Sequence, residues 1–183
     1  MIAMDITIRL AVSSDAENLA ELAGRTFRDT FAADNRPEDI ALHVAEAYGP
    51  LQQGRELSDP TIITLLVEAG GELVGYAQLR RGAAPTCVPD DVPIELSRFY
   101  VARDWHGHGI AQELMRRVDL EAQSGGARTL WLGVWERNER AKAFYRKCSF
   151  VDVGSHVFMV GTDAQTDRIL VRPVAPATTI DSR

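Results

Sequence analysis

The sequence predicts an α/β fold: one domain with a mixed, mostly antiparallel central sheet of about seven strands and about four helices. Three observations predict it. A strand, a glycine-containing loop and a helix follow one another between Phe99 and Met115. Two pairs of strand-like segments are joined by glycine or polar turns, as in antiparallel hairpins. The other apolar segments change between strand and helix spacing along 183 residues, a length that fits one domain.

The N-terminal segments predict a strand and then a helix. Ile6–Val12 begins with alternating apolar and polar residues, which is typical of a strand. Ser14 and Glu17 have the spacing of a capping box, so a helix is expected to begin there. Its predicted buried face holds five apolar residues, namely Leu19, Leu22, Ala23, Phe27 and Phe31.

A helical region and a hairpin come next. Pro37 is a good first helical residue, and the region runs to about residue 57 with a break near Gly49–Pro50. Two β-rich segments follow, at 61–68 and 73–79, and the Gly70–Gly71 turn between them predicts an antiparallel pair.

The middle of the chain alternates between strands and helices. A proline-containing loop, 82–93, leads into the predicted central strand, 94–101. A helix is expected over 109–123, a strand over 129–135, and a second helix over 138–147 with Asn138 as its N-cap.

Two closing strands and a tail complete the predicted domain. The strands are expected over 151–161 and 168–171, joined by a polar turn at 162–167. The domain then spans 1–173, and 174–183 is expected to be a loose tail. Exposed apolar residues in this hairpin would support a homodimer, so both a monomer and a homodimer remain open.

Gly107 and Gly109 precede the helix that begins near Ile110. Glycines let a ligand approach the backbone, and the unpaired amides of a first helical turn favour phosphate. The spacing does not fit a dinucleotide fingerprint, and Gly-Lys-Ser/Thr does not occur in the chain. The loop therefore predicts a site for another kind of diphosphate carrier, with an ordinary turn as the alternative.

Composition excludes several classes of function. A net charge of −6 and a pI near 5.2 argue against a nucleic-acid-binding protein. No apolar run reaches the roughly 20 residues of a membrane span, and the N-terminus does not resemble a signal peptide. Cys87 and Cys148 lack metal-ligand spacing, so they are expected to be reduced thiols in a cytoplasmic protein that binds no metal.

Two motifs resemble the GCN5-related N-acetyltransferase (GNAT) family. His106–Ala111 is similar to the family signature Q/R-x-x-G-x-G/A, with His106 in the place of Gln or Arg. Asn138–Phe150 is similar to N-x-x-A-x-x-F-Y-x-K-x-G-F, with Ser149 in the place of Gly. The resemblance covers about residues 6–171.

The resemblance implies a sheet that splays after the central strand and binds acetyl-CoA along its open edge. The amides of Phe99 and Val101 would then hold the pantetheine arm and polarise the thioester. Tyr145 would be the general acid, and Glu95 would be the base or an anchor for a cationic substrate. The implied acetyl-CoA-binding residues are Phe99, Tyr100, Val101, His106, Gly107, His108, Gly109, Ile110, Ala111, Gln112 and Asn138. Basic residues of the helix that follows Asn138 are expected either to meet the 3′-phosphate or to be solvated.

The implied activity is acetyl transfer from acetyl-CoA to a primary amine by direct attack in a ternary complex. Residues 131–138 and 165–167 are similar to the PaiA-type branch, which is associated with polyamine acetylation, so spermidine or spermine is the expected acceptor. The alternatives are an amino acid, a peptide N-terminus or another small amine. A further alternative is a CoA-binding regulator without catalysis.

Overall fold

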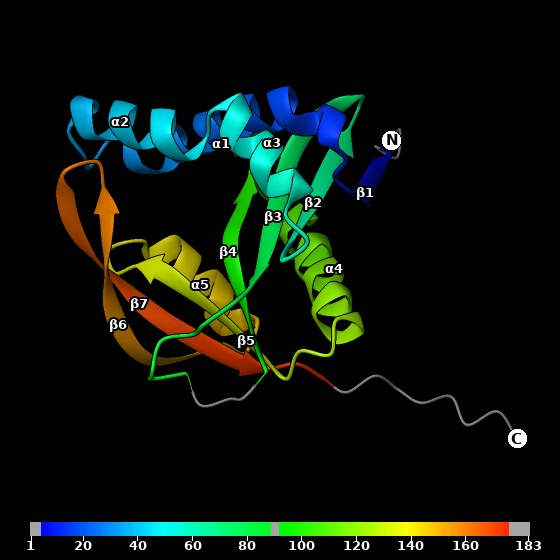
Figure 1. Ribbon diagram of the computed structural model, residues 1–183, viewed down its shortest axis with the longest axis vertical. Helices are drawn as coiled ribbons and strands as arrows, with labels where there is room; N and C mark the ends of the chain where they lie inside the picture. The colour runs from blue at the N-terminus through cyan, green and yellow to red at the C-terminus, as the bar shows by residue number, and fades with distance from the viewer. Residues whose placement is uncertain (1–4, 89–91, 176–183) are drawn as a thin grey trace, which may run out of the picture.

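One seven-stranded mixed sheet forms the centre of the molecule (Figure 1). The computed structural model describes residues 5–88 and 92–175. The strand order is β1-β2-β3-β4-β5-β7-β6, antiparallel except where β4 and β5 run parallel. The strands are β1 (Ile6–Leu10), β2 (Ile62–Ala69), β3 (Glu72–Arg81), β4 (Pro93–Val101), β5 (Thr129–Trp135), β6 (Val151–Val160) and β7 (Asp163–Pro173). The predicted seven-stranded fold is confirmed.

Five α-helices cover the two faces of this sheet. They are α1 (Ala16–Phe31), α2 (Pro37–Ala47), α3 (Pro50–Ser58), α4 (Ile110–Ser124) and α5 (Glu139–Lys147). The first three lie together along one side of the sheet (Figure 1), while α4 and α5 pack on the opposite face. Strand β2 shows the division, because Leu65 and Val67 face α4 whereas Leu66 faces α1.

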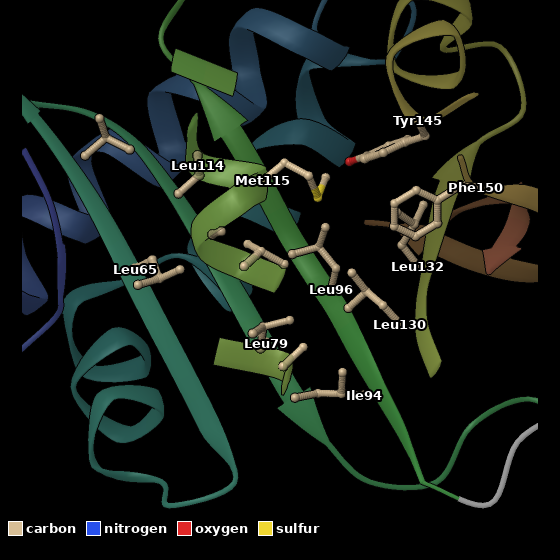
Figure 2. Packing of buried hydrophobic residues seen from close by; sticks show 14 of the residues in the cluster. Leu65, Leu79, Ile94, Leu96, Leu114, Met115, Leu130, Leu132, Tyr145 and Phe150 are labelled. Carbon is tan, nitrogen blue, oxygen red and sulfur yellow. The ribbon is translucent and has the colours of Figure 1, made fainter. Parts of the chain in front are cut away.

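The core under α4 and α5 fixes the position of β4. Leu96 of β4 and Leu132 of β5 pack with Leu114 and Met115 of α4 (Figure 2). Leu114 is fully buried. Complete burial of such a side chain stabilises the fold by roughly 1.5–3 kcal/mol relative to exposure. The central strand is thereby held rigidly below the start of α4.

The start of α1 differs from the prediction. The capping box of Ser14 and Glu17 is not formed, and α1 begins at Ala16 after a short 3₁₀ turn. Asp15 accepts the Val12 amide at 2.7 Å and two hydrogen bonds from the Arg9 guanidinium at 2.8 Å each. Sequence spacing could not reveal Asp15 as the capping residue, because its partner Arg9 belongs to the strand before it.

The predicted turn at 162–167 is also wrong. The turn contains only Gly161 and Thr162, and β7 begins at Asp163. Buried Asp39 of α2 accepts both the amide and the hydroxyl of Thr162, at 2.8 and 2.7 Å. This polar segment forms a strand because β6 pairs with residues 163–167 across the tight turn, and β5 pairs with β7 from Asp167 onward. Hydrophobic alternation does not report this pairing.

The end of the described chain continues past β7. The Val174 amide donates to the carbonyl of Arg128 at 2.9 Å, so the predicted tail begins later than residue 174. Residues 176–183 of that tail lie outside the described residues. Within the described parts of the chain, each helix is too short or too polar to cross a lipid bilayer.

Candidate active site

The two halves of the sheet separate beyond Glu95. Over the described residues, β4 and β5 pair at Pro93–Thr129, Ile94–Leu130 and Glu95–Trp131, and no register pair follows. The Ala102 amide donates to Val74 of β3 at 2.7 Å. Since successive peptide groups of a strand point to opposite edges, the Val101 and Phe99 amides point away from β3 and into the gap. The gap therefore exposes an unpaired strand edge inside the molecule.

A groove of about 530 Å³ lies beside this edge, between the end of β4, the start of α4 and one face of α5. Its lining contains every predicted acetyl-CoA-binding residue except His108, which packs beside Trp105 instead. The predicted residues in the lining are Phe99, Tyr100, Val101, His106, Gly107, Gly109, Ile110, Ala111, Gln112 and Asn138.

The start of α4 has the properties of an anion site. Gly107 and Gly109 have φ angles of 83° and 79°, a left-handed conformation that favours glycine. The Glu113 amide makes the first hydrogen bond of the helix, to the Gly109 carbonyl, so the amides of the preceding turn have no partner within the helix. Arg140 and Lys147 add positive charge from α5 on the other wall of the groove. These groups fit a diphosphate.

His106 joins the two walls of the groove. Its Nδ1 lies 2.7 Å from Arg140 Nη1, and its Nε2 lies 2.8 Å from the Val101 carbonyl oxygen. Because a guanidinium only donates, Nδ1 accepts and Nε2 carries the proton that it donates to Val101. His106 therefore orients Arg140 toward the glycine loop, which is a structural use for the residue that replaces Gln or Arg.

A second, smaller cavity of about 120 Å³ continues from the groove across the splayed sheet. The two share five lining residues, which are Phe99, Tyr100, Asn138, Ala141 and Tyr145. Aromatic side chains from α1, β5 and β6 form much of its wall, namely Phe27, Phe31, Trp135 and Phe158. Arg98, Gln165 and Asp167 supply polar groups. A ligand in the groove can thus meet a second ligand at the shared residues.

Known proteins share this arrangement. The model of the acetyltransferase (GNAT) family matches residues 17–150. The chain belongs to this family. An uncharacterised N-acetyltransferase of Mycobacterium bovis is 36% identical over 159 residues, covering 87% of this chain and 97% of its own. Another, from Lactobacillus delbrueckii subsp. lactis, is 31% identical over 85% of this chain and 90% of its own.

Solved structures agree on the fold. The PaiA N-acetyltransferase of Thermoplasma acidophilum, in complex with coenzyme A, superimposes with a TM-score of 0.73. It covers 93% of this chain and 99% of its own, at 24% identity. The chain is therefore a GNAT-type N-acetyltransferase that uses acetyl-CoA as its cosubstrate.

Tyr145 of this GNAT domain lies where the two cavities meet. It is 8% exposed and packs against Phe99, Phe144 and Phe150. Its hydroxyl points away from Phe150 and toward the centre of the sheet (Figure 2). Burial raises the pKa of Tyr145 well above its usual range, and the nearby Cys148 thiol adds to this effect. The phenol therefore stays protonated at neutral pH and remains a hydrogen-bond donor.

Glu95 is not brought together with Tyr145. It is the last residue of β4 that pairs with β5, and it is absent from the described lining of both cavities. Burial raises the pKa of Glu95, and the positive charges of Arg80 and Arg98 oppose that effect. The role of Glu95 as base or substrate anchor therefore stays a prediction.

Asp167 is the carboxylate that sequence reasoning missed as a site residue. It lines the second cavity and is 8% exposed, and burial raises its pKa to about 6. It was missed because residues 162–167 were predicted to form a turn. The alternation of Gln165 and Asp167 was the available signal, since both face the cavity from β7.

The basic residues of α5, together with Arg137 just before the helix, divide between two surfaces. Arg140 and Lys147 line the groove beside β4. Arg137, Lys142 and Arg146 lie instead at an outer surface with Glu136, Glu139, Asp152 and Arg168. Lys142 pairs with Glu139 at 2.6 Å, so the outer cations are largely balanced by neighbouring carboxylates. The helix thus presents one pair of cations to the groove.

Proposed function

We propose that this N-acetyltransferase acetylates a primary alkylamine held in the second cavity, and that polyamines such as spermidine and spermine are its acceptors. One observation carries the proposal. A buried carboxylate, Asp167, faces a cavity that meets the acetyl-CoA groove at Tyr145. An ammonium group beside Asp167 would lie within the same enclosed space as the thioester. The similarity of residues 131–138 and 165–167 to the PaiA-type branch suggests the polyamine class.

A second carboxylate on β7 supports an acceptor with more than one ammonium group. Asp163, Gln165 and Asp167 alternate along one face of the strand, and Gln165 donates to Asp163 at 2.8 Å. At about 3.3 Å per residue, the carboxylates of Asp163 and Asp167 are separated by about 13 Å along the strand. Asp163 is exposed, whereas Asp167 is buried. A long polyamine can therefore place one end inside the cavity and another at its rim.

The positive charge of Arg98 in the second cavity is already compensated. Arg98 donates to buried Glu56 at 2.5 Å and to Gln78 at 2.8 Å, and it lies over the Tyr48 ring. Its guanidinium is therefore not available to bind the carboxylate of an amino acid. Phe27, Phe31 and Phe158 can cover a methylene chain, and aromatic faces also attract ammonium groups.

Where the two cavities meet, the backbone amides of β4 and the Tyr145 hydroxyl act on different atoms of the thioester in this proposal. The Phe99 and Val101 amides hold the pantetheine arm and polarise the thioester carbonyl. The amine attacks the carbonyl carbon, the C–S bond breaks and the sulfur leaves as a thiolate. The nitrogen then passes its extra proton to that thiolate, which gives the amide and the free thiol of CoA. Tyr145 donates a hydrogen bond to that thiolate, because its raised pKa makes full proton transfer from the phenol unfavourable.

Steady-state thiol release tests the proposal. Acetyl-CoA is offered with spermidine, spermine, butylamine, amino acids and a peptide with a free N-terminus. We expect the polyamines to have the highest kcat/KM. Asp163→Asn should lower kcat/KM for spermidine by about 3–10-fold and leave butylamine unchanged, since only the polyamine reaches the rim. Equal losses for both amines would exclude the two-carboxylate groove, and no turnover with any amine would exclude the activity.

A single-charge amine is the second candidate, because the cavity holds one buried carboxylate. It predicts that butylamine and spermidine have equal kcat/KM. A CoA-binding regulator predicts tight binding of acetyl-CoA, measured by calorimetry, without thiol release. The retained Tyr145 at the junction of the cavities favours catalysis over that alternative.

We also propose that the enzyme is cytoplasmic and is a monomer or a homodimer. Cys87 and Cys148 are free thiols, which suits a reducing compartment. Val157, Phe158 and Met159 are exposed on the edge strand β6, and this apolar segment would favour the dimer. Sedimentation velocity distinguishes the two assembly states.

A further inference from the structure

His156 of β6 is positioned between the second cavity and solvent. It is the cross-strand partner of Asp167 on β7. Its Nε2 is buried, has no hydrogen-bond partner and lies 3.9 Å from Asp167 Oδ2. The side chain as a whole is nevertheless 38% exposed. One nitrogen of the imidazole is therefore enclosed beside the carboxylate, while another part of the ring reaches the surface.

Gly133 of β5 provides the space for this pair. A Cβ atom added at Gly133 would lie 3.0 Å from His156 Nε2 and 3.2 Å from Asp167 Oδ2. Gly133 also lines the second cavity. Any larger residue at this position would displace the imidazole, the carboxylate or both. Because Gly133 has no side chain, the His156–Asp167 pair can lie at the cavity wall.

The reaction requires a group that removes a proton from the acceptor. A primary alkylamine has a pKa of about 10.4 and is mostly protonated at neutral pH, so it has no free electron pair for attack. A buried cavity also offers that proton no direct exit. Asp167 is the carboxylate that contacts this space, and His156 connects it to solvent.

We propose that Asp167 and His156 form the path by which the bound ammonium loses its proton before it attacks the thioester. The N–H bond of the ammonium breaks as the proton passes to Asp167. His156 Nε2 lies 3.9 Å from Asp167 Oδ2, so a side-chain rotation or one bridging water completes the contact. The new O–H bond then breaks as His156 Nε2 takes the proton and becomes an imidazolium. The imidazolium releases a proton to water at its exposed edge. The amine nitrogen keeps the electron pair that forms the amide bond.

The proton affinities of the pair suit this transfer. Burial raises the pKa of Asp167 to about 6, and burial lowers the pKa of His156 below its usual value. Both shifts bring the pKa of the carboxylate and the pKa of the imidazole closer together. A proton therefore moves between the two groups at a small free-energy cost. Asp167 is also a stronger base than an ordinary carboxylate, and it is still ionised above pH 6.

Other ionisable groups around the pair do not compete for the proton. Arg98 on β4 is paired with Glu56 of α3, and Arg137 lies over the Trp135 ring. Burial raises the pKa of Tyr100 and Tyr145, so both stay protonated. His43 of α2 stacks on Phe27, and burial lowers its pKa. From β5, the neighbouring positions supply Gly133 and Trp135, which do not titrate.

The inference rests on the proposed amine acetylation, and acceptor basicity provides its test. His156→Gln and Asp167→Asn are compared with wild type on butylamine and on a fluorinated ethylamine that is already neutral at the assay pH. Loss of general base catalysis should lower kcat/KM for butylamine about 100-fold. The fluorinated amine should lose less than about 5-fold, because it is already neutral and needs no deprotonation before it attacks. Ser155→Ala, an exposed change on the same strand, is the control and should leave both rates unchanged.

The pH profile gives a second readout. In wild type, kcat/KM should rise as Asp167 loses its proton near pH 6. In His156→Gln the rise should move to higher pH, toward the pKa of the free amine. Added imidazole should restore His156→Ala on butylamine, since the ring edge faces solvent.

The possible results separate the two proposals. Equal losses on both amines with an unmoved pH profile would mean that His156 is only structural, and the relay would be wrong while amine acetylation stands. A wild-type enzyme that transfers acetyl to none of the amines would overturn both. Circular dichroism of each variant establishes that it is folded.

Discussion

At the scale of single residues, Tyr145 joins the two halves of the site. It is nearly buried, lines both cavities and keeps its proton because its pKa is raised. Tyr145→Phe removes only the hydroxyl from a packed ring. We expect kcat to fall about 10–100-fold while acetyl-CoA affinity, measured by calorimetry, stays within 2-fold. An unchanged kcat would show that the leaving thiolate needs no donor from this residue.

Gly133 leaves room for His156 and Asp167 because it has no side chain. Gly133→Ala should push His156 and Asp167 apart and lower kcat/KM for butylamine at least 10-fold, because the new Cβ would lie 3.0 and 3.2 Å from their polar atoms. Acetyl-CoA affinity should not change. Gly54→Ala on α3 is the matched control, since its Cβ would meet no atom within 4 Å. That control should stabilise the helix by about 0.5–1 kcal/mol. Equal activity of both variants would contradict the packing argument.

At the scale of elements, α4 and α5 form two walls of the groove in which we propose that acetyl-CoA binds. The amides of the first turn of α4 face cations from α5 across the groove, and His106 holds Arg140 in place. Helix α5 carries cations on two faces, with Arg140 on the groove side and Arg146 on the outer side.

This division predicts different effects of two arginines on one helix. Arg140→Gln should raise KM for acetyl-CoA by about 10-fold, because a hydrogen bond to a charged group contributes about 1.5–3 kcal/mol. The effect should weaken as salt concentration rises. Arg146→Gln, the control, should leave KM within 2-fold. If both variants behave alike, the groove face of α5 has been assigned wrongly.

Helix α3 is attached to the sheet by a buried ion pair. Glu56 is 4% exposed and accepts from Arg98 and Gln78. Burial alone would raise the pKa of Glu56, but Arg98 and the hydrogen bonds from Gln52 and Gln78 outweigh it and hold the pKa below its usual value. A carboxylate whose pKa is lower in the folded state than in the unfolded state stabilises the fold at pH values above its unfolded-state pKa. This contribution is lost as the pH falls through the folded-state pKa.

Glu56→Gln should therefore lower the free energy of unfolding by about 3–5 kcal/mol at pH 7, because it leaves the Arg98 charge buried without a counter-charge. The deficit relative to wild type should shrink below the usual carboxyl pKa. Urea titrations at pH 7 and pH 4 measure both effects. Arg98→Met with Glu56→Met should be more stable than Glu56→Gln alone, and the opposite order would argue against an uncompensated charge.

At the scale of the whole molecule, acetyl-CoA should connect the two halves of the sheet. Strands β1–β4 and β5–β7 are joined by three register pairs, and the groove lies across their separation. A ligand that binds only the folded state stabilises it by about 2.7 kcal/mol at 100 times its Kd. We expect acetyl-CoA to raise Tm by several degrees in calorimetry and to protect the β4 and α4 amides from hydrogen exchange. Residues 1–173 should unfold in one transition, as one domain. Two transitions, with only one shifted by acetyl-CoA, would contradict the single domain.

The sequence by itself predicted most of the fold and brought together most of the residues that line the groove beside β4. Seven strands, the break at Gly49–Pro50 and the cap at Asn138 follow from local spacing and turn chemistry. The groove at residues 106–112 was also predictable, because helix-terminal amides and glycine backbone are properties of a contiguous segment. Local rules suffice where the interacting groups are neighbours in the chain.

Only the tertiary structure decided the second cavity, where we propose that the acceptor binds. Gly133, His156 and Asp167 come from three strands that meet through cross-strand register. The start of β7 was mistaken for a turn because its polar residues pair with β6 and show no hydrophobic alternation. Glu95 was predicted to reach the site from its place on β4, yet the sheet separates only beyond it. The contacts of an acceptor cavity depend on where strands diverge, and that divergence is set by the packing of the helices on both faces.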